Sequence, residues 1–254
     1  MDANVSVLNA THTGAFTEAL SRVLSTEVAE FTYAQIIDGL PTEKSFAEFD
    51  WHREGHPVFE LEHTSLCPGV LERIREFRHV FDPLALTFPL AVKFLHFLFI
   101  DSCQRASELT RVVLQLLSEF QKTHPGTQRF ELRLIELLAV ACHQIAVFLY
   151  NLDDGVHKHC VYETWRNLPR EPPRGEQPVE FIPPTVFYHG MYFASEQYPN
   201  GVADIVGYWA EAKIFGGVVL FDRGESGTEV SKAMAAAEAE LAWRGEGGSA
   251  LTGP

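Results

Sequence analysis

The chain has 254 residues, of which 46% are hydrophobic and 21% are charged, and these values are typical of one large globular domain. Its 34 acidic residues outnumber its 20 lysines and arginines, which gives a formal net charge of -14. A field of this sign repels nucleic-acid phosphates and anionic lipid head groups, so we expect no role for nucleic acid or a membrane. The partner is then expected to be a small-molecule substrate or another protein.

Two segments bear on the location of the protein. Residues Met1–Glu30 contain no basic segment followed by an apolar run, and they are too acidic for a transit peptide. The most apolar stretch, Phe88–Ile100, is shorter than the about 20 residues that span a bilayer, and it contains Lys93 and His96. We therefore expect a cytoplasmic protein in which Phe88–Ile100 is a buried core helix.

Helical periodicity dominates the first part of the chain. Apolar residues recur at helical spacing, and capping residues, prolines and glycines mark where each run begins or ends. The pattern predicts helices over Thr13–Phe31, from Val70, after Pro83, after Pro89, over Ala106–Lys122 and over Thr127–Asn151.

The C-terminal part has a different composition. Leu168–Pro184 is rich in proline and predicts an exposed connection. In Ala203–Asp222, aromatic and β-branched residues flank Gly216-Gly217, a pattern that predicts a hairpin. Glu229–Arg244 is helical in pattern and precedes a frayed tail.

Together these elements predict a mainly α fold, a helical bundle with a small C-terminal β-hairpin. We expect a single domain over residues 1–254, since no second core is indicated. Its expected parts are a helical body (12–165), a proline-rich connection (168–184), a hairpin with a C-terminal helix (185–244) and a tail (245–254).

Cysteine usage argues against thiol chemistry in this chain. The residues Cys67, Cys103, Cys142 and Cys160 show no CxxC spacing. Without a secretory signal they are expected to be reduced, so we predict no disulfide and no thiol metal site. The chain also contains no GxSxG, GxxxxGK or GxGxxG motif, which argues against hydrolases, kinases and dehydrogenases.

Histidines are the strongest candidates for chemistry. His52 and His56 are four residues apart, a spacing that places two imidazoles on one helix face, as a first-row metal requires. Gly55 weakens a helix there, and Pro57 disfavours the α conformation at His56. The alternative is a chance spacing of two surface histidines.

His143 is a second candidate, because it lies in an otherwise apolar helical run. Glu136 and Tyr150 share its stripe of the helix, which suggests a lined cavity. The alternative is a core histidine satisfied by one hydrogen bond. His63 and the pair His157 and His159 also stay open as ligands.

Three parts of the sequence carry a family resemblance. The segment His143–Asn151 resembles the helix that carries the third copper-A histidine of arthropod hemocyanins, and His52 and His56 resemble the His-x3-His pair of the same site. Val202–Arg223 resembles a widespread group of uncharacterised fungal proteins. Together they resemble the fungal hemocyanin-like cyclopenases of quinolone alkaloid biosynthesis.

The resemblance implies a zinc-dependent, ring-contracting lyase of fungal secondary metabolism that converts a cyclopenin-type benzodiazepine to a viridicatin-type quinolone. A single zinc ion would be held by His52, His56 and His143 and would act as a Lewis acid. Glu136 and Glu60 are the carboxylates to test first for proton transfer. The alternatives are a non-catalytic helical interaction or scaffold protein and a copper protein of hemocyanin or tyrosinase type, although copper-B histidines are not recognisable.

Overall fold

The structure is a computed structural model that describes residues 8–46, 56–81, 115–152, 157, 160–167 and 183–220. The chain divides into two units, Met1–Val219 and Leu220–Pro254, and every element described below lies in the first. Several predicted elements lie outside the described residues, namely Phe88–Ile100, the helices after Pro83 and Pro89, the C-terminal helix Glu229–Arg244, the tail and most of the connection 168–184.

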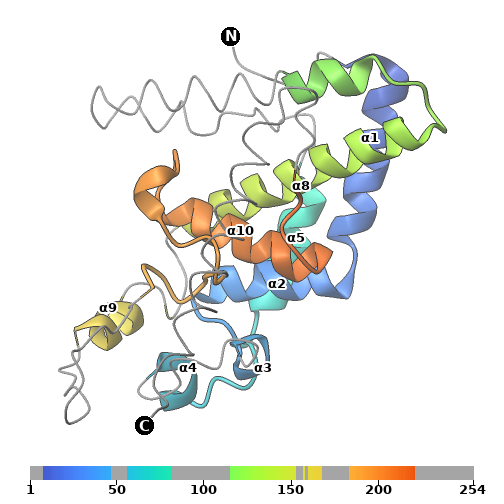
Figure 1. Ribbon diagram of the computed structural model, residues 1–254. Helices are drawn as coiled ribbons and strands as arrows, with labels where there is room; N and C mark the ends of the chain where they lie inside the picture. The colour runs from blue at the N-terminus through green and yellow to red at the C-terminus, as the bar shows by residue number, and fades with distance from the viewer. Residues whose placement is uncertain are drawn as a thin grey trace, which may run out of the picture. The chain divides into compact units, whose positions relative to one another are not determined.

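The described residues are mainly α-helical, as the sequence predicts (Figure 1). They contain no β-strand, and a single isolated bridge joins His189 to Tyr192. Residues 115–121 are helical as well. The named helices are α1 (Ala10–Leu24), α2 (Glu27–Asp38), α3 (Glu43–Phe46), α4 (Pro57–Glu60), α5 (Val70–Val80), α8 (Gln128–Asn151), α9 (Cys160–Arg166), the 3-10 helix η3 (Ser195–Gln197) and α10 (Val202–Phe215).

Helix α8 confirms the prediction for Thr127–Asn151. Thr127 is its N-cap, and the Thr127 hydroxyl oxygen accepts a hydrogen bond from the amide of Phe130 at 3.2 Å. Among the described residues, α8 is the one helix whose length and composition would allow it to cross a membrane, but 67% of its most apolar window is buried inside the protein. That burial is typical of a core helix.

The prediction of one helix over Thr13–Phe31 is wrong, because two helices share this stretch. Helix α1 ends at Leu24, and the Thr26 side chain caps the start of α2 by accepting from the amide of Ala29 at 3.2 Å. The Ser25 hydroxyl donates to the Arg22 carbonyl at 2.8 Å, which satisfies one of the last acceptors of α1. The apolar spacing continues across the break and hides it.

The hairpin prediction over Ala203–Asp222 is also wrong, since Val202–Phe215 forms helix α10. Gly216 lies in the left-handed region at φ 77° and ends the helix, so the glycine pair marks a helix C-terminus. Most of α10 is buried, and apolar residues therefore occur around much of its circumference. This arrangement removes the helical period from the sequence.

The core is built where α10 packs against α8 and α2 (Figure 1). Helix α10 contributes Ile205, Val206 and Trp209, all at most 3% exposed. Tyr33 of α2 donates a hydrogen bond to the carbonyl of Cys142 in α8 at 3.1 Å. The three helices thus share one apolar interior that also encloses several polar groups.

The closest approach in this interior involves Gly207. A methyl group at Gly207 would lie 2.4 Å from Nε2 of His143 and 2.5 Å from two of its ring carbons. Real side chains do not reach such distances, so only glycine allows α10 to lie this close to the imidazole. The close packing of Gly207 against His143 therefore fixes the distance between α10 and α8 at this position.

Gly207→Ala is expected to lower the free energy of unfolding by about 1–3 kcal/mol, because the added methyl group overpacks this contact. Gly14→Ala is the control, since Gly14 is a solvent-exposed residue in the middle of α1 and no atom lies within 4 Å of the added carbon. It should stabilise the protein by about 0.5–1 kcal/mol. Urea unfolding measures both, and equal effects of the two changes would contradict the packing described for Gly207.

Candidate metal centre

Asp38 is the last residue of α2, and its side chain is fully buried. Its Oδ2 atom accepts a hydrogen bond from the amide of Cys67 at 3.0 Å and lies 3.1 Å from Nε2 of His63. Its Oδ1 atom is buried and has no hydrogen-bond partner among the described residues. One carboxylate oxygen thus remains available inside the protein.

His63 follows α4, and three hydrogen bonds to main-chain groups fix its position. Its amide donates to the carbonyl of Val58 at 2.9 Å, and its own carbonyl accepts from the amide of Glu43 at 2.9 Å. Its Nδ1 atom lies 2.9 Å from the carbonyl oxygen of Pro41. Since a carbonyl only accepts, Nδ1 carries a proton, and Nε2 is the atom directed toward Asp38.

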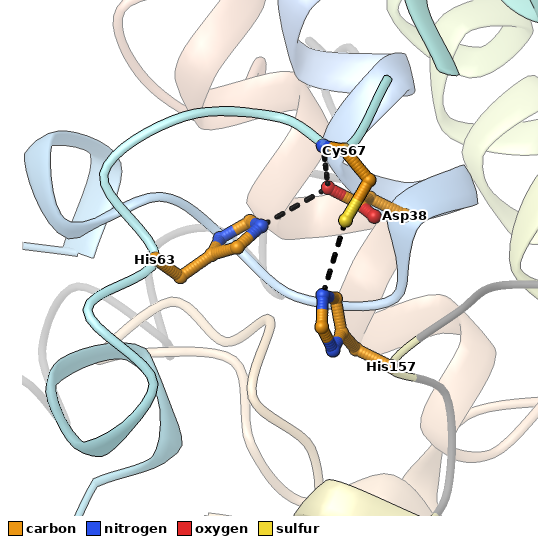
Figure 2. Close-up of side chains that lie close together, drawn as sticks. All are labelled: Asp38, His63, Cys67 and His157. Atoms are coloured by element: carbon orange, nitrogen blue, oxygen red, sulfur yellow. Dashed lines mark hydrogen bonds and ion pairs between the residues drawn. The ribbon is translucent and has the colours of Figure 1, made fainter. Parts of the chain in front are cut away.

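Cys67, which lies in the same loop as His63, and His157 complete the group (Figure 2). Cys67 lies shortly before α5, and its Sγ is 3.3 Å from Nε2 of His157. The amide of His157 donates to the main-chain carbonyl of Asp38 at 3.0 Å, so α2 positions this residue as well. Cys67 and His157 are partly exposed, whereas Asp38 and His63 are buried.

We call these four residues the metal cluster: Asp38, His63, Cys67 and His157. Each offers one ligand atom, and the four atoms all lie within 4.8 Å of one another. A tetrahedral site with metal–ligand distances of about 2.0–2.3 Å has edges of roughly 3.3–3.8 Å. The separations of 3.1 Å and 3.3 Å within the cluster are close to such edges. The cluster could therefore hold a metal ion after small shifts.

Electrostatics at the cluster follow from burial and from the Asp38 charge. Burial alone would raise the pKa of Asp38, but hydrogen bonds from His63 and from the Cys67 amide outweigh it and lower that pKa. The hydrogen bond to Asp38 raises the pKa of His63. Burial and the nearby carboxylate raise the pKa of the Cys67 thiol, and burial lowers the pKa of His157.

The pKa shifts of Cys67 and His157 argue against a cysteine nucleophile. A Cys–His nucleophile pair needs a thiol of lowered pKa beside a histidine of raised pKa. Cys67 and His157 show the opposite directions, so their neutral forms are favoured. A bound metal ion deprotonates a coordinating thiol directly, which makes ligation the chemistry better suited to this pair.

The expected ligands His52, His56 and His143 are not in the metal cluster. His52 lies outside the described residues, so that triad stays a prediction. His56 has extended backbone at ψ 133°, as expected before Pro57, and caps α4 by accepting from the Val58 amide at 3.3 Å. Its buried ring stacks on Phe46 at a centroid distance of 3.9 Å.

His143 lies between two carboxylates of α10. Its Nδ1 is 2.8 Å from Oε1 of Glu211, and its Nε2 is 3.0 Å from Oδ1 of Asp204. Burial would lower the pKa of His143, but the hydrogen bonds to Asp204 and Glu211 outweigh it and raise the pKa to about 9. The sequence suggested that His143 belongs to a polar stripe of the helix that lines a cavity. At His143 the structure shows a buried ion-pair network with Asp204 and Glu211 instead.

The two carboxylates considered for proton transfer lie in different surroundings. Glu136 is buried, and both of its oxygens accept from Nη1 of Arg133, at 2.9 Å and 2.7 Å. Glu60 is exposed in α4. Neither residue belongs to the metal cluster.

Sequence reasoning identified only part of the cluster. His63 and His157 stayed open as ligands, but Asp38 gave no signal, since it lies in the amphipathic run of a helix. The prediction against a thiol metal site rested on the absence of CxxC spacing, whereas Cys67 is one of the four residues of the candidate cluster. His63 and Cys67 lie four residues apart in one loop, but Asp38 and His157 come from distant parts of the chain, so residue spacing alone could not find the whole set. Cys67 and Cys142 are free thiols.

Comparison of the chain with protein-family models, with curated proteins and with solved structures gave no match in any of the three.

The raised pKa of His143 has a consequence for stability. Its folded-state pKa of about 9 lies above the usual histidine value of 6.5, so the stabilisation from its protonated form is fully present below pH 6.5 and is lost as the pH rises through about 9. Relative to His143→Gln, the wild type should lose up to about 3 kcal/mol of unfolding free energy over this range. Urea unfolding of both proteins at several pH values measures the difference, and a difference independent of pH would contradict the assignment.

Proposed function

We propose that the chain binds one zinc ion through Asp38, His63, Cys67 and His157. The observation that carries the proposal is the convergence of four ligand atoms within 4.8 Å, beside a buried Asp38 oxygen that has no partner among the described residues. The contact of His63 Nδ1 with the Pro41 carbonyl supports it further. Metal-ligating histidines typically donate their second ring nitrogen to such an acceptor, which directs the other nitrogen to the metal.

Charge favours a divalent ion at the metal cluster. The Asp38 carboxylate and the Cys67 thiolate supply two negative charges, and two neutral imidazoles supply none. A divalent cation makes this partly buried group neutral, which avoids the cost of an unpaired buried charge. Thiolate and imidazole ligands in a tetrahedral arrangement suit zinc, which also accepts carboxylate oxygen.

The purified, dialysed protein is expected to contain about one zinc ion per chain. Cys67→Ser and Asp38→Asn should each remove most of it, because they replace an anionic ligand with a weaker neutral one. His79→Ala is the control, since His79 is exposed on α5. Elemental analysis measures the metal, and circular dichroism checks that each variant is folded.

His143→Gln distinguishes this site from the histidine triad predicted from the sequence. A zinc ion at the metal cluster is retained in this variant, whereas an ion held by His52, His56 and His143 is lost. Wild-type protein without stoichiometric metal would contradict both sites.

A catalytic role for the ion is the second part of the proposal. Cys67 and His157 are partly exposed, so a small molecule can approach the ion from their side. Catalytic zinc needs an open coordination position, which the displacement of one protein ligand would supply. The reaction proposed from the family resemblance is the ring contraction of a cyclopenin-type benzodiazepine, in which zinc acts as a Lewis acid on a substrate oxygen.

Zinc-loaded protein is therefore expected to convert a cyclopenin-type substrate to the corresponding quinolone, as followed by chromatography with mass detection. Removal of zinc with a chelator should abolish turnover, and one equivalent of zinc should restore it. His79→Ala should retain the wild-type rate. No turnover by fully zinc-loaded protein would rule out the lyase and leave a structural zinc ion in an interaction or scaffold protein.

A further inference from the structure

Gln35 links α2 to the segment that follows it. The residue lies one turn before Asp38, and its side chain is 1% exposed. Its Oε1 accepts two hydrogen bonds from Thr42, one from the amide at 2.8 Å and one from the hydroxyl at 3.3 Å. Its Nε2 donates to the carbonyl of Phe31 at 3.3 Å. One buried amide therefore fixes Thr42 relative to the helix that carries Asp38.

The residues on both sides of Thr42 contact His63. The Pro41 carbonyl accepts from Nδ1 of His63, and the Glu43 amide donates to the His63 carbonyl, both at 2.9 Å. A shift of Thr42 would therefore move both contacts of His63 together. Gln35 makes no hydrogen bond to any of the four cluster side chains among the described residues.

We propose that Gln35 is a positioning residue of the metal centre, which holds the Pro41 carbonyl where it orients the His63 ring. The inference rests on the proposed zinc site. Gln35 reaches the metal through three steps: its Oε1 fixes Thr42, Thr42 fixes the position of its neighbour Pro41, and the Pro41 carbonyl holds Nδ1 of His63. The side chains of Asp38 and His63 thereby keep their relative position, although they approach the ion from different segments.

A glutamine meets these contacts because it combines an acceptor and a donor without charge. Thr42 presents two donors, so Oε1 must accept, while the Phe31 carbonyl needs a donor. Methionine has a similar length but lacks both functions, and it leaves the buried amide of Thr42 without this acceptor. Glutamate keeps an acceptor for Thr42, and asparagine has the same groups on a side chain that is one methylene shorter.

The test measures zinc affinity by competition with a chromophoric chelator. Gln35→Met should weaken zinc binding about 10–100-fold, as loss of an outer-shell partner does. Gln35→Glu should recover much of the affinity, because a carboxylate oxygen can still accept from Thr42. Gln144→Met is the matched control, since Gln144 is a buried glutamine of α8 outside the described contacts of the cluster. Its zinc affinity should equal that of the wild type.

A second readout separates positioning from general stability. Cobalt substituted for zinc should show a changed visible spectrum in Gln35→Met, since the ligand geometry is disturbed, and an unchanged spectrum in Gln144→Met. If Gln35→Met does not fold, Gln35→Asn is measured by the same criterion, because its shorter side chain withdraws the acceptor from Thr42.

The inference is overturned if the folded Gln35 variant binds zinc as tightly as Gln144→Met and gives the wild-type cobalt spectrum. Failure of the zinc site itself has a different result, because the wild-type protein would then bind no metal. The two failures are thus distinguished by the wild-type measurement alone.

Discussion

The buried carboxylate at the end of α2 is the constraint on which the metal cluster depends. A carboxylate removed from water must be paired, and Asp38 meets this need by drawing in the Cys67 amide and the His63 imidazole. Its main-chain carbonyl accepts from the amide of His157, so Asp38 connects α2 both to the loop of His63 and Cys67 and to His157. The four ligand atoms then lie within 4.8 Å of one another, and a divalent cation could bind them by displacing the protons of His63 Nε2 and the Cys67 thiol.

The buried His143 has surroundings that differ from those of His63 in the metal cluster. At His143 both ring nitrogens lie against carboxylates, so a proton on the imidazole supplies the positive charge and no nitrogen is directed to a metal. Gly207 lets α10 approach closely enough for this network to form. A proton on His143 thus offsets part of the carboxylate charge in the α8–α10 network, whereas we propose that zinc neutralises the cluster at Asp38.

The sequence predicts the helical class well but locates the site poorly. Helices α5 and α8 were predictable because their proline, glycine or threonine boundaries precede clear apolar periods. Helix α10 was not, since a helix buried around most of its surface loses that period. Asp38 and Cys67 could not be found because their place in the candidate cluster comes from contacts with residues that are distant in sequence. The sequence shows only that His143 could coordinate a metal. The structure shows that both of its ring nitrogens instead form hydrogen bonds to carboxylates of α10.

X-ray absorption at the zinc edge of the purified protein tests the central claim most directly, because it reports the elements bound to the ion. Zinc bound at the metal cluster should be four-coordinate, with one sulfur at about 2.3 Å and three nitrogen or oxygen atoms at about 2.0–2.2 Å. A first shell of nitrogen and oxygen alone would contradict it, because Cys67 would then not be a ligand.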